Sequence, residues 1–530
     1  MYKRLKKSAA MLCSLAILAS SLPVGALDSA GKAENISLGG PELLENGDCT
    51  PIDEDVLREH TIVVGEDTEA DAGINMVTTP PPSSYDLSTS EYFPTLITPT
   101  APISTAAACV YYQFTYTANR YNDITSNKST TVYSPDWTGR ALRSLGNSTY
   151  YASADKFYDF LKEHGALHYS DDSSTSNGAM PTDEAKLREA MKTRLNTWNV
   201  RTIPSTGITR TNTSLIYIKS LISMGDLPRV EIPYYAVTRN SSTYGDVVVM
   251  TLTKSTLNDF SGIVVGYNDN IEVDINGDGV ISACERGAFK VLGGRNGGST
   301  GYTWIMYDAL NYQSSISGEW EDEYTTLYRA PRQPAFHNPN TSSGNYFYTI
   351  SVRAYDTEVM ARVSFKNAVQ YMPRVNLYRC TDDPNDEIEY ETTQNTMNGT
   401  SYQQNFFLLF DFSLVGLSFS NIGTSGYRYE VLANTTSGTV DNVRFIDDLG
   451  DTVVTPTKSG VVYGAELCFP IGDLNYSGTV TTQDLVRLQN YLDGNRELSS
   501  LQLDRADADR DGNVDTDDLQ RIMQIIAASK

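Results

Sequence analysis

The sequence predicts a multidomain protein: an α+β domain, then a β-sandwich-like domain, then a small α-helical unit with two calcium loops. The chain has 530 residues, enough for several domains. Alternating strand-like runs begin near Tyr346, after a region of mixed helical and strand-like patterns. A repeat of Asp-rich loops, each followed by an apolar-periodic helix, ends the chain. We therefore place the three domains at residues 81–332, 345–469 and 471–530.

The N-terminal segment has the pattern of a signal peptide over residues 1–26. Lys3 and Arg4 begin a cationic stretch, an apolar run follows, and small residues precede the expected cleavage point. The apolar run is short for a membrane span, so we expect a secreted protein. Residues 27–80 are acidic and end in a proline-rich stretch, which predicts an N-terminal arm or a propeptide-like segment.

The acidic composition argues against two classes of partner. A net charge of −24 opposes binding to nucleic acid and to an anionic membrane surface. The same acidity suits solubility and calcium binding. Five cysteines follow the signal peptide, and their wide spacing predicts neither a disulfide framework nor a zinc site. They are Cys49, Cys109, Cys284, Cys380 and Cys468.

Periodicity predicts the main elements of the first two domains. In the α+β domain we expect helices at Tyr111–Tyr121, Ala154–His164 and Glu184–Leu195, and strands at Val247–Leu252, Ile263–Tyr267 and Tyr302–Tyr307. In the second domain, alternating runs separated by Gly, Asn, Thr and Ser are typical of an antiparallel sandwich. Examples are Tyr348–Val352, Ala361–Phe365 and Tyr427–Val431.

Two twelve-residue loops in the C-terminal unit have the spacing of calcium ligands. The loop that begins at Asp473 recurs 34 residues later at Asp507, with oxygen ligands at positions 1, 3, 5, 7, 9 and 12. Gly478 and Gly512 permit the sharp turn at position 6. The expected ligands are Asp473, Asn475, Ser477, Thr479, Thr481 and Asp484 in the first loop, and Asp507, Asp509, Asp511, Asn513, Asp515 and Asp518 in the second.

A loop followed by a helix, twice, at the C-terminus of an exported chain resembles a type I dockerin. The resemblance covers about 60 residues. It implies calcium-dependent binding to the cohesin of a scaffolding protein, within a cellulosome-type complex at the surface of an anaerobic bacterium. It also implies recognition positions at Thr482, Gln483, Arg487, Thr516, Asp517 and Arg521.

A third loop has the same spacing inside the α+β domain. Strand-like runs rather than helices flank it, so we predict a calcium ion that holds a connection between two strands. Its role would be structural, because a saturated site leaves no open position for a substrate. A hairpin turn without metal is the alternative. The expected ligands are Asp274, Asn276, Asp278, Val280 through its carbonyl, Ser282 and Glu285.

The region from Pro81 to about Ala330 resembles a papain-like cysteine peptidase of the dockerin-bearing bacterial type. The blocks that carry the resemblance are SYDLSTSEYF from Ser84, YYQFTYTAN from Tyr111, YSPDW from Tyr133, VGYND from Val265, GAFK from Gly287 and GYTWIMYDALN from Gly301. In an active member, the resemblance implies a Cys nucleophile, a His base, an Asn that orients the His, and a Gln that helps bind the oxyanion.

The positions expected to hold this chemistry are substituted. The nucleophile position falls near Ser104, the base position on Phe260 or its neighbour, and the orienting position on Gly293. A different placement of the gap makes Cys109 the nucleophile, although we favour a small apolar residue on a buried helix face. The four histidines all lie away from the expected strand: His60, His164, His168 and His337.

Three functions fit these observations, and we rank them in this order. The first is a pseudopeptidase, attached through the dockerin, that binds peptide or a partner protein in a degenerate cleft. The second is an active papain-like cysteine peptidase with a rearranged site. The third is a carbohydrate-directed module in plant polysaccharide breakdown, because dockerins usually carry plant-wall enzymes or binding modules.

Overall fold

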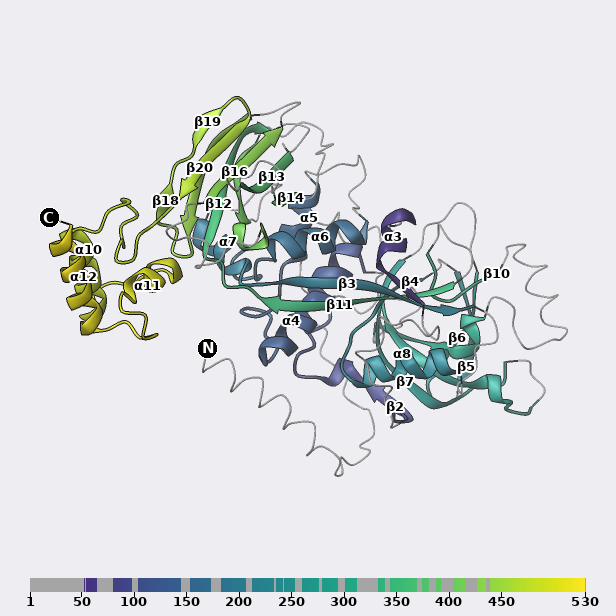
Figure 1. The fold of residues 1–530 in the computed structure, drawn as a ribbon. Helices are drawn as coiled ribbons and strands as arrows, with labels where there is room; N and C mark the ends of the chain where they lie inside the picture. The colour runs from purple at the N-terminus through teal and green to yellow at the C-terminus, as the bar shows by residue number, and fades with distance from the viewer. Residues whose placement is uncertain are drawn as a thin grey trace. The chain divides into compact units, whose positions relative to one another are not determined.

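The computed structural model describes most residues between Ile52 and Ser529 (Figure 1). The described residues are 52, 54–63, 80–97, 103–143, 153–172, 183–205, 212–232, 235–241, 243–252, 260–275, 279–293, 301–311, 332–338, 344–368, 374–380, 388–391, 404–415, 427–434 and 439–529. The predicted signal peptide and most of the predicted arm lie outside them. Within the described part of the chain, no helix is long and apolar enough to cross a bilayer.

Eleven of the described strands form one mixed sheet in the central domain. Its main path runs β1-β3-β11-β4-β7-β8-β9-β6-β10, with β2 paired to β7 and β5 paired to β6. The long strand β7 buries Ile263, Val264 and Val265 in succession, as expected for a strand covered on both faces. The strands are β1 (Thr61–Val63), β2 (Ser84–Asp86), β3 (Thr193–Pro204), β4 (Arg229–Ile232), β5 (Tyr235–Ser241), β6 (Gly245–Leu252), β7 (Phe260–Glu272), β8 (Arg286–Leu292), β9 (Tyr302–Met306), β10 (Arg332–Gln333) and β11 (Gly344–Ala354).

A wholly buried helical segment packs against this sheet. The π-helical η4 (Ala107–Phe114) continues directly into α4 (Thr115–Asn122). All 8 residues of η4 are buried. Its own apolar side chains lie all around the helix axis instead of along one face, which is typical of a segment enclosed by the core. The other helical elements of the domain are α3 (Glu54–His60), η3 (Leu87–Thr89), α5 (Pro135–Arg143), α6 (Ala154–His164), α7 (Glu184–Ala190), α8 (Thr213–Ser223), η5 (Ala283–Glu285) and η7 (Tyr307–Leu310).

Two elements differ from the sequence-based expectation, and strand pairing explains both. The helix expected over Glu184–Leu195 ends at Ala190, and β3 begins at Thr193 because its backbone pairs with β11. Strand β11, which the boundary at residue 345 assigned to the sandwich, lies in the central sheet between β3 and β4. Alternation within one strand predicts a buried face, but it does not say which sheet the strand joins.

The described part of the N-terminal arm belongs to the central sheet. Strand β1 pairs in parallel with β3, and α3 precedes it directly. Leu57 is 3% exposed, and the His60 ring stacks on Trp198 with 3.7 Å between ring centroids. This segment therefore covers the β3 edge of the sheet, which would otherwise present unpaired backbone groups.

The second domain is a sandwich of two antiparallel sheets, as the sequence predicts. One sheet has the order β15-β12-β17-β18, and the other has β14-β13-β16-β20-β19. Buried residues on facing strands, such as Phe445 and Tyr429, fill the space between them. The elements are β12 (Val359–Ala368), β13 (Arg374–Cys380), β14 (Ile388–Glu391), β15 (Gln404–Asp411), η8 (Phe412–Val415), β16 (Tyr427–Asn434), β17 (Thr439–Asp447), β18 (Thr452–Val454), β19 (Thr457–Ser459) and β20 (Val462–Leu467).

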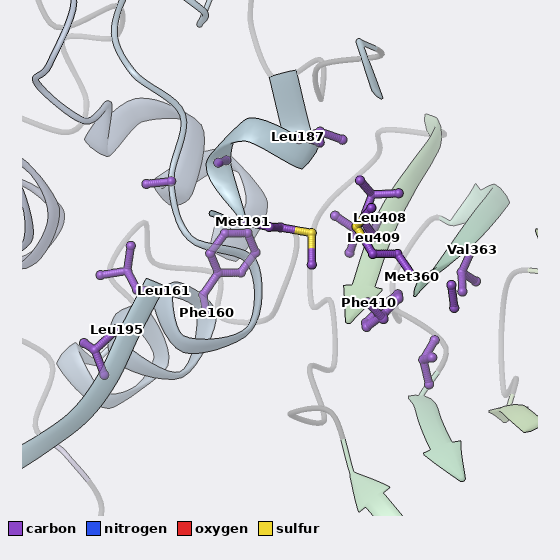
Figure 2. Close-up of a cluster of buried hydrophobic side chains, with 14 of the residues drawn as sticks. Phe160, Leu161, Leu187, Met191, Leu195, Met360, Val363, Leu408, Leu409 and Phe410 are labelled. Carbon is purple, nitrogen blue, oxygen red and sulfur yellow. The ribbon is translucent and has the colours of Figure 1, made fainter. Parts of the chain in front are cut away.

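One apolar core joins the sandwich to helices α6 and α7 of the central domain. Figure 2 shows Leu187 and Met191 on one side of this contact, with Leu408 on the other. Fully burying each such side chain contributes roughly 1.5–3 kcal/mol. The ion pair of Arg194 with Asp411, both fully buried, also joins β3 to β15. The two domains therefore share hydrophobic and ionic contacts.

The C-terminal unit contains α10 (Thr482–Leu492), α11 (Ser500–Ala506) and α12 (Thr516–Ala528). Helices α10 and α12 follow the two predicted loops, and α11 connects the two repeats. Few apolar residues are fully buried in its core, Leu474, Leu488 and Ile522 among them. A core of this size rarely stabilises a unit of about 60 residues without a metal ion or a disulfide.

Candidate metal centres and a buried polar centre

The first C-terminal loop is organised by carboxylates at its two ends. Asp473 Oδ2 accepts a hydrogen bond from the Gly478 N–H at 2.7 Å. Asp484 accepts from the N–H groups of Leu474 at 2.9 Å and Thr481 at 2.8 Å. Both carboxylates are buried, and burial raises the pKa of Asp473 above its usual value. A bound cation would offset the cost of this buried negative charge.

The second loop repeats these connections. Asp507 Oδ2 accepts from the Gly512 N–H at 3.1 Å. Asp518 accepts from the N–H groups of Ala508 at 2.7 Å and Asp515 at 2.8 Å. In each loop, the carboxylate at position 1 therefore accepts a hydrogen bond from the N–H at position 6. The carboxylate at position 12 accepts from the N–H groups at positions 2 and 9.

Oxygen atoms of the second loop converge in a way that fits calcium. Ligand atoms of Asp507, Asp509 and Asp511 all lie within 4.8 Å of one another. Asp507 Oδ1 is buried, and no group among the described residues donates a hydrogen bond to it. Calcium prefers clustered carboxylate and carbonyl oxygens of this kind, so the donor set present here fits the ion.

Most of the predicted partner-binding side chains are exposed on the C-terminal unit. Thr482, Gln483, Thr516, Asp517 and Arg521 are exposed at the starts and along the faces of α10 and α12. Arg487, in contrast, is partly buried, and its Nη1 donates to the Leu474 carbonyl at 3.4 Å.

Two apolar side chains on these helices add to that surface, and the sequence analysis did not select them. Val486 on α10 is 60% exposed, and Met523 on α12 is 44% exposed. Both interrupt otherwise polar positions of an amphipathic helix, which is the signal that could have identified them.

The loop inside the central domain has the same internal connections. Asp274 Oδ2 accepts from the Gly279 N–H at 2.8 Å. Glu285 accepts from the N–H groups of Ile275 at 2.8 Å and Ser282 at 2.7 Å. These contacts link positions 1 to 6, and 12 to 2 and 9, as in the two C-terminal loops.

Strands β7 and β8 flank this third loop, with the short η5 between them. The predicted ligands Asn276 and Asp278 lie outside the described residues. The Val280 side chain is 65% exposed and has no oxygen atom. A calcium ligand from this residue would therefore be its backbone carbonyl. Glu285 is fully buried at the other end of the loop.

Three segments that are distant in the sequence meet inside the central domain. Ile103, just before η4, forms an isolated antiparallel bridge with Ser261 at the start of β7. A Cβ atom on Gly293, just after β8, would lie 2.6 Å from Ile103 Cγ1 and 3.0 Å from the Ser261 carbonyl oxygen. These segments are the ones in which we place the nucleophile, base and orienting positions.

The side chains at this meeting point are hydroxyls. Ser104 is 2% exposed, and its Oγ accepts from the Ala107 N–H at 3.1 Å, as a helix cap does. Ser261 Oγ donates to Thr105 Oγ1 at 3.4 Å. Phe260 is the first residue of β7, and its side chain lies outside the described part of the structure.

A buried charged pair lies beside these hydroxyls. Arg229 Nη2 donates to Glu231 Oε1 at 3.1 Å, and both residues lie on β4 with no exposed surface. The same guanidinium donates to Ser261 Oγ at 3.4 Å and to the Tyr158 hydroxyl at 3.1 Å. The centre thus contains an arginine and a carboxylate that bind each other.

The network continues through Tyr158 to the buried helical segment. Tyr158 donates to Gln113 Oε1 at 2.8 Å, and Gln113 Nε2 donates to the carbonyls of Leu227 at 3.0 Å and Tyr348 at 2.6 Å. The sequence analysis missed this network. The alternation of charged and apolar residues in Arg229–Ile232, within an otherwise apolar region, is the signal that could have indicated it.

Cys109 lies inside the helical segment, away from solvent. It is fully buried, and burial raises the pKa of its thiol to about 11. A thiol of this kind is almost entirely protonated at neutral pH and is a weak nucleophile. Among the cysteines whose side chains are described, Cys109 and Cys284 are free thiols.

Three of the four histidines, His164, His168 and His337, make the following contacts in the structure. The His164 ring contacts the Leu409 carbonyl at 3.1 Å, and burial lowers its pKa to about 4. His168 packs on the Tyr133 ring with 4.4 Å between centroids. His337 comes nearer to the buried pair, because its backbone N–H donates to the Glu231 carbonyl at 3.1 Å. Burial lowers the pKa of His337 to about 4 as well.

Comparison with known families identifies the C-terminal unit. Residues 471–527 match the dockerin type I domain. Domains of this type bind calcium and a cohesin, so the dockerin implies an extracellular, cellulosome-type attachment. None of the curated proteins matches the chain.

Solved structures similar to this chain include cysteine proteases. Xylellain, a cysteine protease from Xylella fastidiosa, is 12% identical and matches over 58% of this chain and 97% of its own, with a TM-score of 0.33. Procathepsin L2 from the larval midgut of Tenebrio molitor is 11% identical, over 66% of this chain and 90% of its own, with a TM-score of 0.35. Procathepsin B S9 from Trypanosoma congolense is 10% identical and matches over 58% of this chain and 87% of its own, with a TM-score of 0.32.

Proposed function

We propose that this protein is a cohesin-bound subunit whose papain-like central domain lacks cysteine peptidase activity and binds peptide or a partner protein. The observation that supports this most strongly is the meeting of Ile103, Ser261 and Gly293. In an active peptidase of the resembling family, these segments would supply a thiol, an imidazole and an amide. Among the described residues, the groups here are hydroxyls, the Arg229 guanidinium and a glycine.

The chemistry of cysteine peptidases needs a base within hydrogen-bond reach of the nucleophile. Such a base contributes about 10²- to 10⁴-fold to the rate. Ser104 is occupied as a helix cap, and Ser261 contacts Thr105 and Arg229. An arginine cannot accept the proton, because its pKa stays above about 12.

The alternative of an active peptidase depends on Cys109. Its thiol would have to leave a site where it is fully buried, and where its pKa is about 11. The carbohydrate-directed alternative depends on exposed aromatic rings in the sandwich. Of the sandwich tyrosines whose exposure the structure describes, Tyr429 is fully buried, Tyr463 is 5% exposed and Tyr378 is partly buried, so none of them presents a fully exposed ring to a sugar.

We also propose a calcium ion in the loop from Asp274 to Glu285. What supports it is the set of contacts that this loop shares with the two dockerin loops, including Gly279 at position 6 with φ of +79°. The ion would join β7 to β8 at the end of this strand pair opposite Gly293, and its role would be structural. The calcium content of the purified protein tests this, because Asp274→Asn should lower it by one ion per chain. An unchanged content would contradict the third site.

A pull-down with a panel of type I cohesins tests the attachment. Binding is expected in calcium and should be lost in the double variant Asp473→Ala/Asp507→Ala, which removes the position 1 ligand of each loop. The matched control is Asp274→Asn, which alters the third loop and should leave cohesin binding unchanged. Retained binding by the double variant would contradict calcium-dependent docking.

Casein hydrolysis tests the absence of peptidase activity. The wild-type protein and Cys109→Ala should both show no turnover above background between acid and neutral pH. Turnover by the wild type that disappears in Cys109→Ala would contradict the proposal and favour the active alternative.

A further inference from the structure

Tyr476 of the first dockerin loop contacts the sandwich. Its hydroxyl donates to Asp447 Oδ2 at 2.7 Å and shares a hydrogen bond with Ser499 Oγ at 2.8 Å. Its ring packs on Phe469 with 5.1 Å between centroids. Asp447 ends strand β17 and has no exposed surface.

Further contacts connect the same turn of the sandwich, residues 447–451, to the dockerin. The Asp448 carboxylate accepts from the Ser500 N–H at 2.9 Å and from its hydroxyl at 2.8 Å. Arg496 and Asp451 form an ion pair at 3.2 Å. Leu501 of α11 is fully buried in the same apolar core as the sandwich residue Tyr463. The dockerin is thus packed on the sandwich over several elements.

The two dockerin repeats use the same loop position for different purposes. Tyr476 and Arg510 both occupy position 4, and both have a left-handed backbone, with φ of +59° and +65°. Arg510 Nη1 donates to Asp504 Oδ1 at 2.9 Å, so its contact stays inside the dockerin. Tyr476 instead extends to Asp447. Of the two position 4 side chains, Tyr476 in the first repeat is therefore the one that contacts the sandwich.

Calcium occupancy should decide whether Tyr476 can make this contact. The predicted ligands Asn475 and Ser477 stand on either side of it in the chain. A left-handed backbone at a residue other than glycine is strained, and it persists only where its surroundings fix it. In an EF-hand-type loop, the ion supplies that constraint by binding positions 3 and 5. Loss of the ion releases the residue that reaches the sandwich.

We propose that the turn 447–451 of the sandwich is a docking surface for the first dockerin loop, engaged only while that loop holds calcium. The proposal uses the calcium binding of the dockerin and is independent of the role of the central domain. Its consequence is that calcium fixes the orientation in which the dockerin is presented to a cohesin. By linkage, the sandwich in turn raises the calcium affinity of the first loop above its value in the undocked dockerin.

Hydrogen–deuterium exchange of the full-length protein tests the docking. The amides of Leu449 and Asp451 bind Asp447 Oδ1, at 3.1 Å and 2.9 Å, so the turn reports on its own order. Calcium should slow exchange in peptides that cover the turn, and a chelator should reverse this. In calcium, Tyr476→Phe, which keeps the ring and removes the donor, should show faster exchange at the turn than the wild type does.

Two further variants complete the design. Asp447→Asn keeps the Oδ1 acceptor for the turn but replaces Oδ2 with an amide that cannot accept from Tyr476, and it leaves the dockerin sequence unchanged. Arg510→Gln alters the same loop position in the second repeat and is the matched control, with exchange at the turn expected to equal the wild type. In a calcium titration, Tyr476→Phe should lower the affinity of one site about 5-fold or more.

Protection of the turn that does not respond to chelator would overturn the proposal. So would wild-type protection in both Tyr476→Phe and Asp447→Asn, or an equal loss of protection in Arg510→Gln. Protection of α10 and α12 in the same experiment shows that the dockerin stays folded in each variant.

Discussion

The dockerin and the central domain both bury carboxylates, but they balance the negative charge differently. In the dockerin, Asp473 and Asp518 are buried in the two loops of a calcium-binding domain type, and carboxylate oxygens of the second loop lie within 4.8 Å of one another. In the central domain, Glu231 is buried beside Arg229, which the chain itself supplies. We therefore expect the order of the dockerin to depend on an ion from outside the chain, whereas Glu231 has its counter-charge within the chain.

Removal of calcium should produce the largest effect and should separate the two regions. With a chelator, repulsion among the loop carboxylates is no longer offset, and the small core cannot hold the unit together. We expect complete loss of amide protection in α10 and α12 of the full-length protein, while α6 of the central domain stays protected. Hydrogen–deuterium exchange measures both in one sample. Unchanged protection of α10 and α12 in chelator would contradict the expectation that calcium orders the dockerin.

Breaking the ion pair should have the next largest effect, confined to the central domain. Arg229→Met leaves Glu231 buried without its partner, which should lower the free energy of unfolding by about 3–5 kcal/mol. Replacing both residues, as Arg229→Met with Glu231→Leu, should recover most of this loss, because no charge is left buried. Urea unfolding in calcium measures the difference. A single variant as stable as the wild type would show that the pair contributes nothing.

The smallest expected effect on stability concerns Glu358. Here a bound proton, instead of a metal ion or an arginine, neutralises a partly buried carboxylate. Glu358 directly precedes β12, and burial, with negative charges nearby, raises its pKa to about 7. Between about pH 4.3, the usual pKa of a glutamate, and pH 7, the folded state holds a proton that the unfolded state releases. The contribution of Glu358 to stability therefore falls as the pH rises through this window.

The variant Glu358→Gln isolates this contribution. It should match the wild type in thermal unfolding near pH 4 and be more stable near pH 8, since glutamine carries no charge to desolvate. Because the group is partly exposed, the difference should be small. Equal midpoints at both pH values would contradict a raised pKa.

Sequence contiguity explains why the calcium loops could be predicted and the polar centre could not. Each loop lies within twelve consecutive residues, so its spacing alone predicts ligands on one turn of chain. The central sites depend on strand pairing. That Ser261 lies beside Ile103 and Gly293 follows from the order of β4, β7 and β8 in the sheet. The sequence predicts that the catalytic residue types are substituted, but it cannot say which side chains surround those positions.

Strand β11 illustrates the same limit at the level of domains. Its alternation predicts a strand correctly, yet its long-range pairing with β3 places it in the central sheet. The contact of Tyr476 with Asp447 was also hidden from sequence, because the tyrosine stands at a loop position that has no ligand role. Local geometry can be derived from residue types, whereas partners distant in the chain require the fold.

Labelling with an epoxide probe for papain-type cysteine peptidases tests the central claim most directly. The calcium-saturated, full-length protein would be incubated with the probe near neutral pH, and the labelled residue found by mass spectrometry, with papain as the positive control. We predict no specific labelling of Cys109, because its thiol is buried, protonated and without a paired imidazole. Stoichiometric labelling of Cys109 that is lost in Cys109→Ala would contradict the account and show that a histidine reaches the site.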